Sequence, residues 1–133
     1  MLQFYLLSVL SLILGGAALA WGTPDANARL VRQILARRWT RIGIGAVAAV
    51  TGIIKLFVRA PGDTVPVAGD LLPALVGIAV AVALGAELWA HQKGATPETE
   101  KVRALSAYYK LPLGILSMAT GLVHFFVPGA VII

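Results

Sequence analysis

The chain carries an internal repeat: a pattern in its first half recurs, in the same order, in its second half. Residues 51–58 match 120–127, and residues 16–19 match 85–88. Between these matches, 23–25 (Thr-Pro-Asp) is echoed by 96–98 (Thr-Pro-Glu). Each half reads as an apolar segment, a polar loop and a second apolar segment. We therefore predict two repeats of one helical hairpin, about 1–66 and about 67–133.

The composition restricts this hairpin to a membrane. The chain has 133 residues, of which 59% are hydrophobic and 13% charged, whereas a soluble domain carries about 25% charged residues. Four apolar runs, at about 2–21, 42–58, 71–90 and 111–133, approach the ~20 residues that cross a bilayer. We predict an all-α integral membrane protein with one transmembrane domain over 1–133. It would be a four-helix bundle of two tandem hairpins with the same orientation.

The basic residues predict the orientation. Nine of the eleven Lys and Arg residues fall in the loops 22–41 and 91–110, and only Lys55 and Arg59 lie toward the other side. Short loops rich in Lys and Arg stay in the cytoplasm. We expect both termini outside the cytoplasm, in a bacterial inner membrane, and a first apolar run retained as a helix rather than cleaved. Topology explains the net charge of +5, so nucleic acid is not an expected partner.

The cytoplasmic loops contain helix-start signals. Thr23 and Thr96 suit a helix N-cap, and the Pro that follows each suits the first helical position. Apolar residues at 30, 31, 34 and 35 recur at helical spacing, which predicts a short amphipathic helix on the inner surface. The basic surface around it comprises Arg29, Arg32, Arg37, Arg38 and Arg41. Recognition of anionic lipid or of a cytosolic partner is one interpretation, and ordinary positive-inside charge is the one we favour.

The outer loop, 59–70, has two interpretations. Its Pro and Gly residues predict a structured turn, with Asp70 as the cap of the third span. Alternatively, Asp63 and Asp70 hold a cation, but two carboxylates alone form a weak site. We favour the turn.

Three ionisable residues fall within the apolar runs: Lys55, Glu87 and His124. Lys55 lies 14 residues beyond Arg41, and His124 lies 14 beyond Lys110, so both are ~21 Å from the inner side and share a level. Glu87 lies near the inner edge, where Arg37, Arg38 or Arg41 can pair with it. Lys55 is expected to extend to the outer interface.

His124 is expected to hydrogen-bond within the bundle, with Thr51 or Thr120 as candidate partners. The alternatives are that Lys55, His124, Thr51 and Thr120 line a ligand or proton site, or that His124 is a haem axial ligand, since ionisable residues in a span are functional candidates by default. We favour the structural roles.

Small residues predict how the helices pack. Gly77, Ala81 and Gly85 recur every four residues in the third span, and such stripes let helix backbones approach closely. They serve packing within the bundle or against a partner helix.

The polar residues form none of the usual catalytic constellations. The chain has no cysteine, and no nucleophile–base pair or glycine-rich phosphate loop is visible. We expect no enzyme activity, no metal and no cofactor. The leading hypothesis is a non-catalytic, structural or accessory membrane subunit that packs with itself or within a larger complex. The alternative is a small carrier or channel with a site between the repeats near Lys55 and His124.

Overall fold

The computed structural model describes residues 2–21, 30–57 and 68–126, and these residues form five α-helices. The helices are α1 (Leu2–Trp21), α2 (Leu30–Ala36), α3 (Arg38–Phe57), α4 (Ala68–Lys93) and α5 (Pro97–Phe126). The four long helices correspond to the four apolar runs, and α2 is the predicted short amphipathic helix. The all-α prediction is confirmed.

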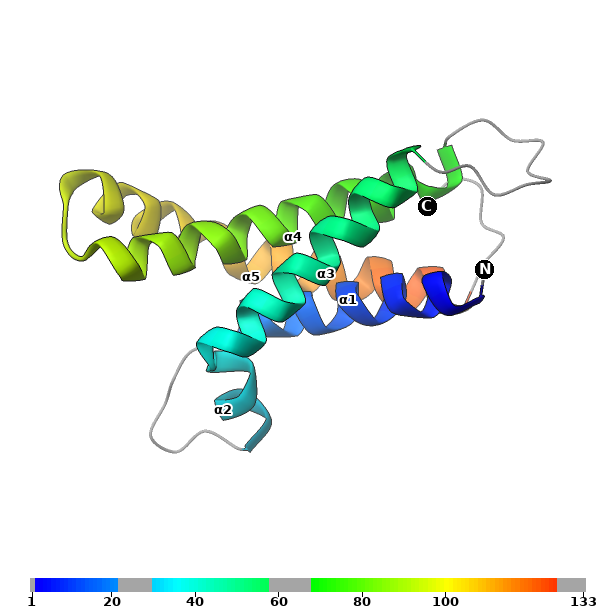
Figure 1. Cartoon of the computed structure of the whole chain (residues 1–133), viewed down its shortest axis with the longest axis horizontal. Coiled ribbons are helices and arrows are strands. Elements are labelled where there is room, and N and C mark those ends of the chain that lie inside the picture. The colour runs from blue at the N-terminus through cyan, green and yellow to red at the C-terminus, as the bar shows by residue number, and fades with distance from the viewer. Residues whose placement is uncertain (1, 22–29, 58–67, 127–133) are drawn as a thin grey trace.

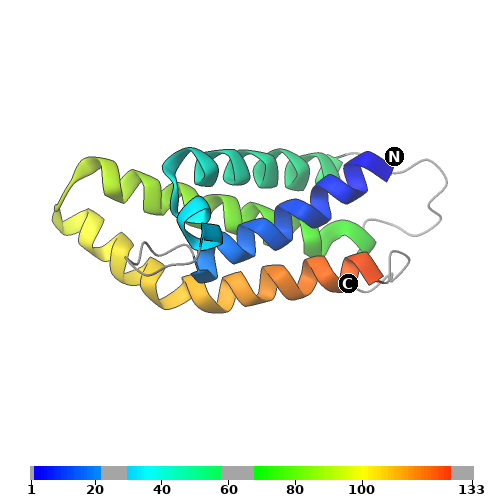
Figure 2. The ribbon, with the colours of Figure 1, turned by 90° about the horizontal axis from the view of Figure 1, so that it is seen from below.

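The long helices pack into an antiparallel bundle. Helices α1 and α4 run in one direction, and α3 and α5 run back (Figure 1). The most extensive contacts join α1 to α5 and α3 to α4. Seen from below, α3 and α5 lie along opposite edges, with α1 and α4 between them (Figure 2). The largest interfaces therefore join the first half of the chain to the second.

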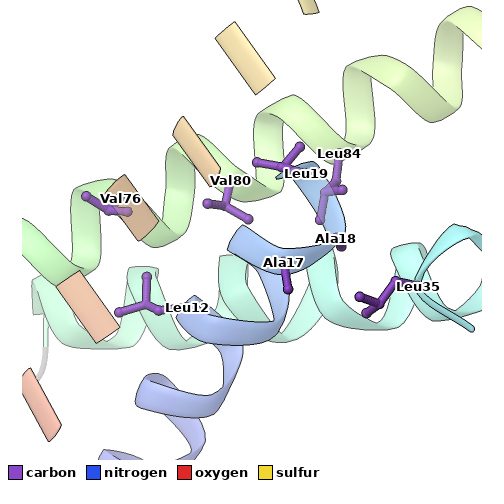
Figure 3. Packing of buried hydrophobic residues seen from close by; sticks show 8 residues of the cluster. All are labelled: Leu12, Ala17, Ala18, Leu19, Leu35, Val76, Val80 and Leu84. Atoms are coloured by element: carbon purple, nitrogen blue, oxygen red, sulfur yellow. The ribbon is translucent and has the colours of Figure 1, made fainter. Parts of the chain in front are cut away.

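A cluster of buried apolar residues holds the centre of the bundle. Leu12 and Leu19 of α1 pack against Val80 and Leu84 of α4, and Leu35 of α2 joins them at one end (Figure 3). Each of these five side chains is at most 5% exposed. The contact between α1 and α4 thus forms the middle of the bundle, which keeps α3 and α5 apart.

Glycines permit the closest helix approaches. A Cβ added at Gly16 would stand 2.5 Å from the carbonyl oxygen of Gly114, and one added at Gly52 would stand 2.9 Å from that of Ala74. Both distances are shorter than any Cβ contact allows, so only glycine fits. Of the predicted α4 stripe, a Cβ at Gly77 would lie 3.3 Å from the Ala48 carbonyl, whereas Gly85 faces open space. Ala81, between them, is partly buried.

The predicted 91–110 loop is mostly helical. Only residues 94–96 separate α4 from α5, and Gly94 makes the turn with φ of 75°. The Thr96 hydroxyl accepts a hydrogen bond from the amide of Thr99 at 3.2 Å, and the Thr99 hydroxyl accepts one from the amide of Thr96 at 2.8 Å. This reciprocal cap starts α5 fourteen residues before the predicted span, because the polar residues that follow Pro97 continue the helix. The predicted Thr96 cap is confirmed.

Two other cap predictions have different outcomes. Thr23 lies outside the described residues. Helix α4 begins at Ala68, two residues before Asp70, so Asp70 lies in its first turn rather than at the cap position. Asp63 lies outside the described residues too, so the cation alternative stays untested.

The exterior of the bundle is apolar and its interior holds polar side chains. Exposed apolar residues occur on every long helix, for example Leu10, Val50, Val82 and Ile115, each at least half exposed. The buried polar residues are Ser8, Ser11, Arg41, Thr51, Thr99, Ser117, Thr120 and His124. Two of the described helices, α3 and the 71–93 part of α4, are long and apolar enough to cross a membrane by length and composition, which by itself is weak support for insertion.

Candidate functional site in the bundle interior

Lys55 and His124 meet inside the bundle. The Lys55 Nζ lies 3.1 Å from Nε2 of His124, and His124 is 5% exposed. Helices α3 and α5 do not pack directly on each other within the described ranges, so the two side chains reach across the diagonal between them. When Lys55 is charged it can only donate, and Nε2 is then the acceptor. In that state His124 is neutral and carries its proton on Nδ1.

Tyr5 of α1 completes this cluster. Its hydroxyl donates to the backbone carbonyl of His124, and its ring lies 5.1 Å from the imidazole, centroid to centroid. No role at this site was predicted for Tyr5 from the sequence. Its helical spacing with the buried Ser8 and Leu12 was the available signal, because residues three and seven positions on share its face.

Closer to the N-terminal ends of α3 and α5, the buried hydroxyl groups of Thr51 and Ser117 donate to helix carbonyls. Thr51 donates to the carbonyl of Val47 at 2.7 Å, and its hydroxyl lies 3.4 Å from that of Ser11. Ser117 donates to the carbonyl of Leu12 at 2.7 Å, which ties α5 to α1. Thr120 is also buried. The four predicted polar-site residues, Lys55, His124, Thr51 and Thr120, are therefore all partly or fully buried on α3 and α5.

A second polar contact lies toward the other end of the bundle. Arg41 forms a salt bridge with Glu87 at 2.7 Å and donates to the carbonyl of Ala18 at 3.2 Å. The predicted pairing of Glu87 with an arginine is confirmed, with Arg41 as the partner. Arg41 is therefore not part of an exposed basic surface, since its side chain is only 10% exposed. The arginine sits where α1, α3 and α4 meet and links all three.

The rest of the predicted basic surface is exposed where it is described. Arg32, Arg37 and Arg38 are exposed on α2, at the break between α2 and α3, and on the first turn of α3. Arg29 lies outside the described residues. Among the described residues no group of three or more His, Asp or Glu side chains is arranged to hold a metal ion.

A protein-family model matches the chain over residues 1–124, and the chain belongs to that family. The match covers all five helices nearly to the end of α5. Comparisons with curated proteins and with solved structures gave no match.

Proposed function

We propose that the protein is an integral membrane protein whose four long helices span the bilayer. The distribution of polarity supports this: large apolar side chains cover the outside, while hydroxyls, an ion pair and the Lys55–His124 pair are inside. Water would favour the opposite distribution, because exposed apolar surface is costly in water and buried polar groups must find partners. In lipid, the same distribution leaves each face in its preferred surroundings.

The two halves of the chain are tandem hairpins with one orientation. Three pairs of equivalent residues support this repeat. Lys55 and His124 are 69 positions apart and touch. Their neighbours Gly52 and Gly121 both lie close to the other half of the chain. The atoms nearest to them, on Ala74 and Ile13, are not equivalent, but Ile78 on α4 also lies beside Gly52 and Val9 on α1 also lies beside Gly121. Val9 and Ile78 are themselves 69 positions apart. Such matching contacts are expected for hairpins related by a two-fold axis along the membrane normal.

The protein functions as a non-catalytic structural or accessory subunit, which packs with itself or within a larger membrane complex. The observation that carries this proposal is that the interior polar groups bond one another and nearby carbonyls. Lys55 contacts His124, Arg41 contacts Glu87 and the Ala18 carbonyl, and Ser117 contacts the Leu12 carbonyl. Groups used in this way stabilise the association of helices in lipid.

Purification in a mild detergent from the native membrane tests this function. The subunit proposal expects the chain to elute with other membrane proteins, or as an oligomer of fixed size, and its thermal stability to be independent of small molecules. Elution as a monomer that a solute or ion stabilises would contradict it.

A small carrier is the second candidate. Lys55 and His124 come from different halves and meet between them, the position at which carriers of this architecture bind their substrate. If the protein is a carrier, Lys55→Met should abolish a ligand-induced rise in melting temperature while the helix content stays normal. The matched control is Lys93→Met, which removes a lysine from the opposite end of the bundle. An equal loss in both variants would contradict a site at Lys55.

A further inference from the structure

Helix α2 and the first turn of α3 combine basic and apolar side chains on one exposed segment. Leu30 and Val31 are 72% and 65% exposed, and Trp39 is 81% exposed. Arg32, Arg37 and Arg38 are exposed beside them. The segment therefore presents apolar and cationic groups together, which is the composition of helices that lie in the plane of a membrane surface.

The segment is fixed to the bundle by one side chain and by its backbone. Leu35 is buried in the central cluster, and backbone hydrogen bonds run through the break between the helices: the amide of Arg37 donates to the carbonyl of Ile34 at 3.1 Å, and the amide of Arg41 donates to the carbonyl of Arg37 at 3.0 Å. Helix α2 lies at the end of the bundle where α1 finishes and α3 begins (Figures 1 and 2). Its uncovered apolar residues thus lie where the proposed bilayer meets water.

The segment contains basic residues and no acidic residue. The sequence has no Asp or Glu between residues 26 and 62, and Arg32, Arg37 and Arg38 are exposed there, whereas Arg41 is buried against Glu87. The turn between α4 and α5 differs, because Glu98 and Glu100 accompany its lysines and Glu100 lies 3.5 Å from Arg103. Two basic regions at the same end of the bundle therefore differ in how strongly they attract an acidic surface.

We propose that α2 and the first turn of α3 form a binding site for anionic phospholipid headgroups, with Arg32, Arg37 and Arg38 as the contacting cations. This inference rests on the proposed insertion into a membrane. The phosphate and any further acidic group of the lipid take hydrogen bonds from the guanidinium groups, for which arginine is well suited. The acyl chains cover Leu30, Val31 and Trp39. The site selects lipids that carry a net negative charge, and phosphatidylcholine carries none.

Trp39 reports on this site directly. In a Trp21→Phe, Trp89→Phe background it is the only tryptophan, since the chain has three. The full-length protein is reconstituted in vesicles in which either phosphatidylglycerol or phosphatidylcholine carries brominated acyl chains. Bromine quenches tryptophan on contact, so the two quenching curves give the relative affinity of the lipids beside Trp39. The proposal expects a preference of about fivefold for phosphatidylglycerol, and a smaller one at about 1 M salt.

The matched variants remove three charges each. Arg32→Gln, Arg37→Gln, Arg38→Gln should bring the preference close to one. Lys93→Gln, Lys101→Gln, Lys110→Gln should leave it nearly unchanged, although the loss of net charge is the same. Circular dichroism and detergent elution confirm that both variants fold.

Five outcomes overturn the inference, each in a distinguishable way. Equal quenching by both lipids, or equal loss in both triple variants, rules out a selective site at α2. Relief of quenching by added inorganic phosphate would assign the site to free phosphate instead. Absence of quenching by either lipid would show that Trp39 does not contact acyl chains and would refute the site, whereas failure of the protein to remain with the vesicles would refute membrane insertion and with it the proposed function.

Discussion

Lys55 and His124 lie 3.1 Å apart although they belong to helices on opposite edges of the bundle, and they hold equivalent places in the two halves of the chain. The contact therefore lies between the halves. Tyr5, which donates to the carbonyl of His124, connects the pair to the first helix.

A double-mutant cycle measures what this contact contributes. Polar side chains of membrane helices also find hydrogen-bond partners when the bundle unfolds. We therefore expect a coupling energy of only about 0.6 kcal/mol between Lys55→Met and His124→Leu. The measurement is the free energy of unfolding in mixed detergent. A coupling energy near zero would mean that the two side chains do not interact in the folded protein.

The α1–α5 interface gives a sharper prediction. Gly16→Ala places a Cβ 2.5 Å from the Gly114 carbonyl, so the helices must separate, and we expect a loss of ~1–3 kcal/mol in the free energy of unfolding. Gly85→Ala is the matched control, because Gly85 is the equivalent residue of the repeat and faces open space. Gly85→Ala should be neutral or slightly stabilising, since alanine favours a helix over glycine. Equal effects of the two variants would contradict this packing.

Removal of Arg41 should be the most damaging of these single changes. Arg41→Gln leaves the Glu87 carboxylate largely buried without its cation, and breaking a buried ion pair costs ~3–5 kcal/mol. The neighbouring Arg38→Gln removes an exposed charge and should stay within ~0.5 kcal/mol of the parent. Thermal unfolding of both variants in the same detergent checks the difference. If adding Glu87→Gln restores the stability that Arg41→Gln loses, the unpaired carboxylate is the cause.

The helices, and the positions of their residues along the bundle axis, could be predicted from the sequence. The contacts between the helices could not. Hydropathy and cap residues give α1 its bounds and Thr96 its cap, because these depend on local sequence. Counting residues from the basic ends gave Lys55 and His124 a shared level. It did not predict that Lys55 would turn inward to His124, because direction depends on which helices lie diagonally opposite. For the same reason the role of Tyr5 was missed.

The glycines illustrate the same limit. Gly77 and Gly85 are eight residues apart within one regular stripe, yet only Gly77 lies against another helix. A four-residue repeat turns by about 40° around a helix at each step, so Gly85 points about 80° away from Gly77. The pattern predicted a packing face and could not predict how far around α4 that face extends.

Cysteine accessibility in intact bacterial cells tests membrane insertion and orientation together. The chain has no native cysteine, so single replacements at Gln3 and Lys93, both exposed and at opposite ends of the bundle, are unambiguous. A membrane-impermeant maleimide should label Gln3→Cys in intact cells, and should label Lys93→Cys only after the inner membrane is opened. Labelling of Lys93→Cys in intact cells with protection of Gln3→Cys would reverse the orientation. Recovery of the protein in the soluble fraction would refute its insertion into a membrane.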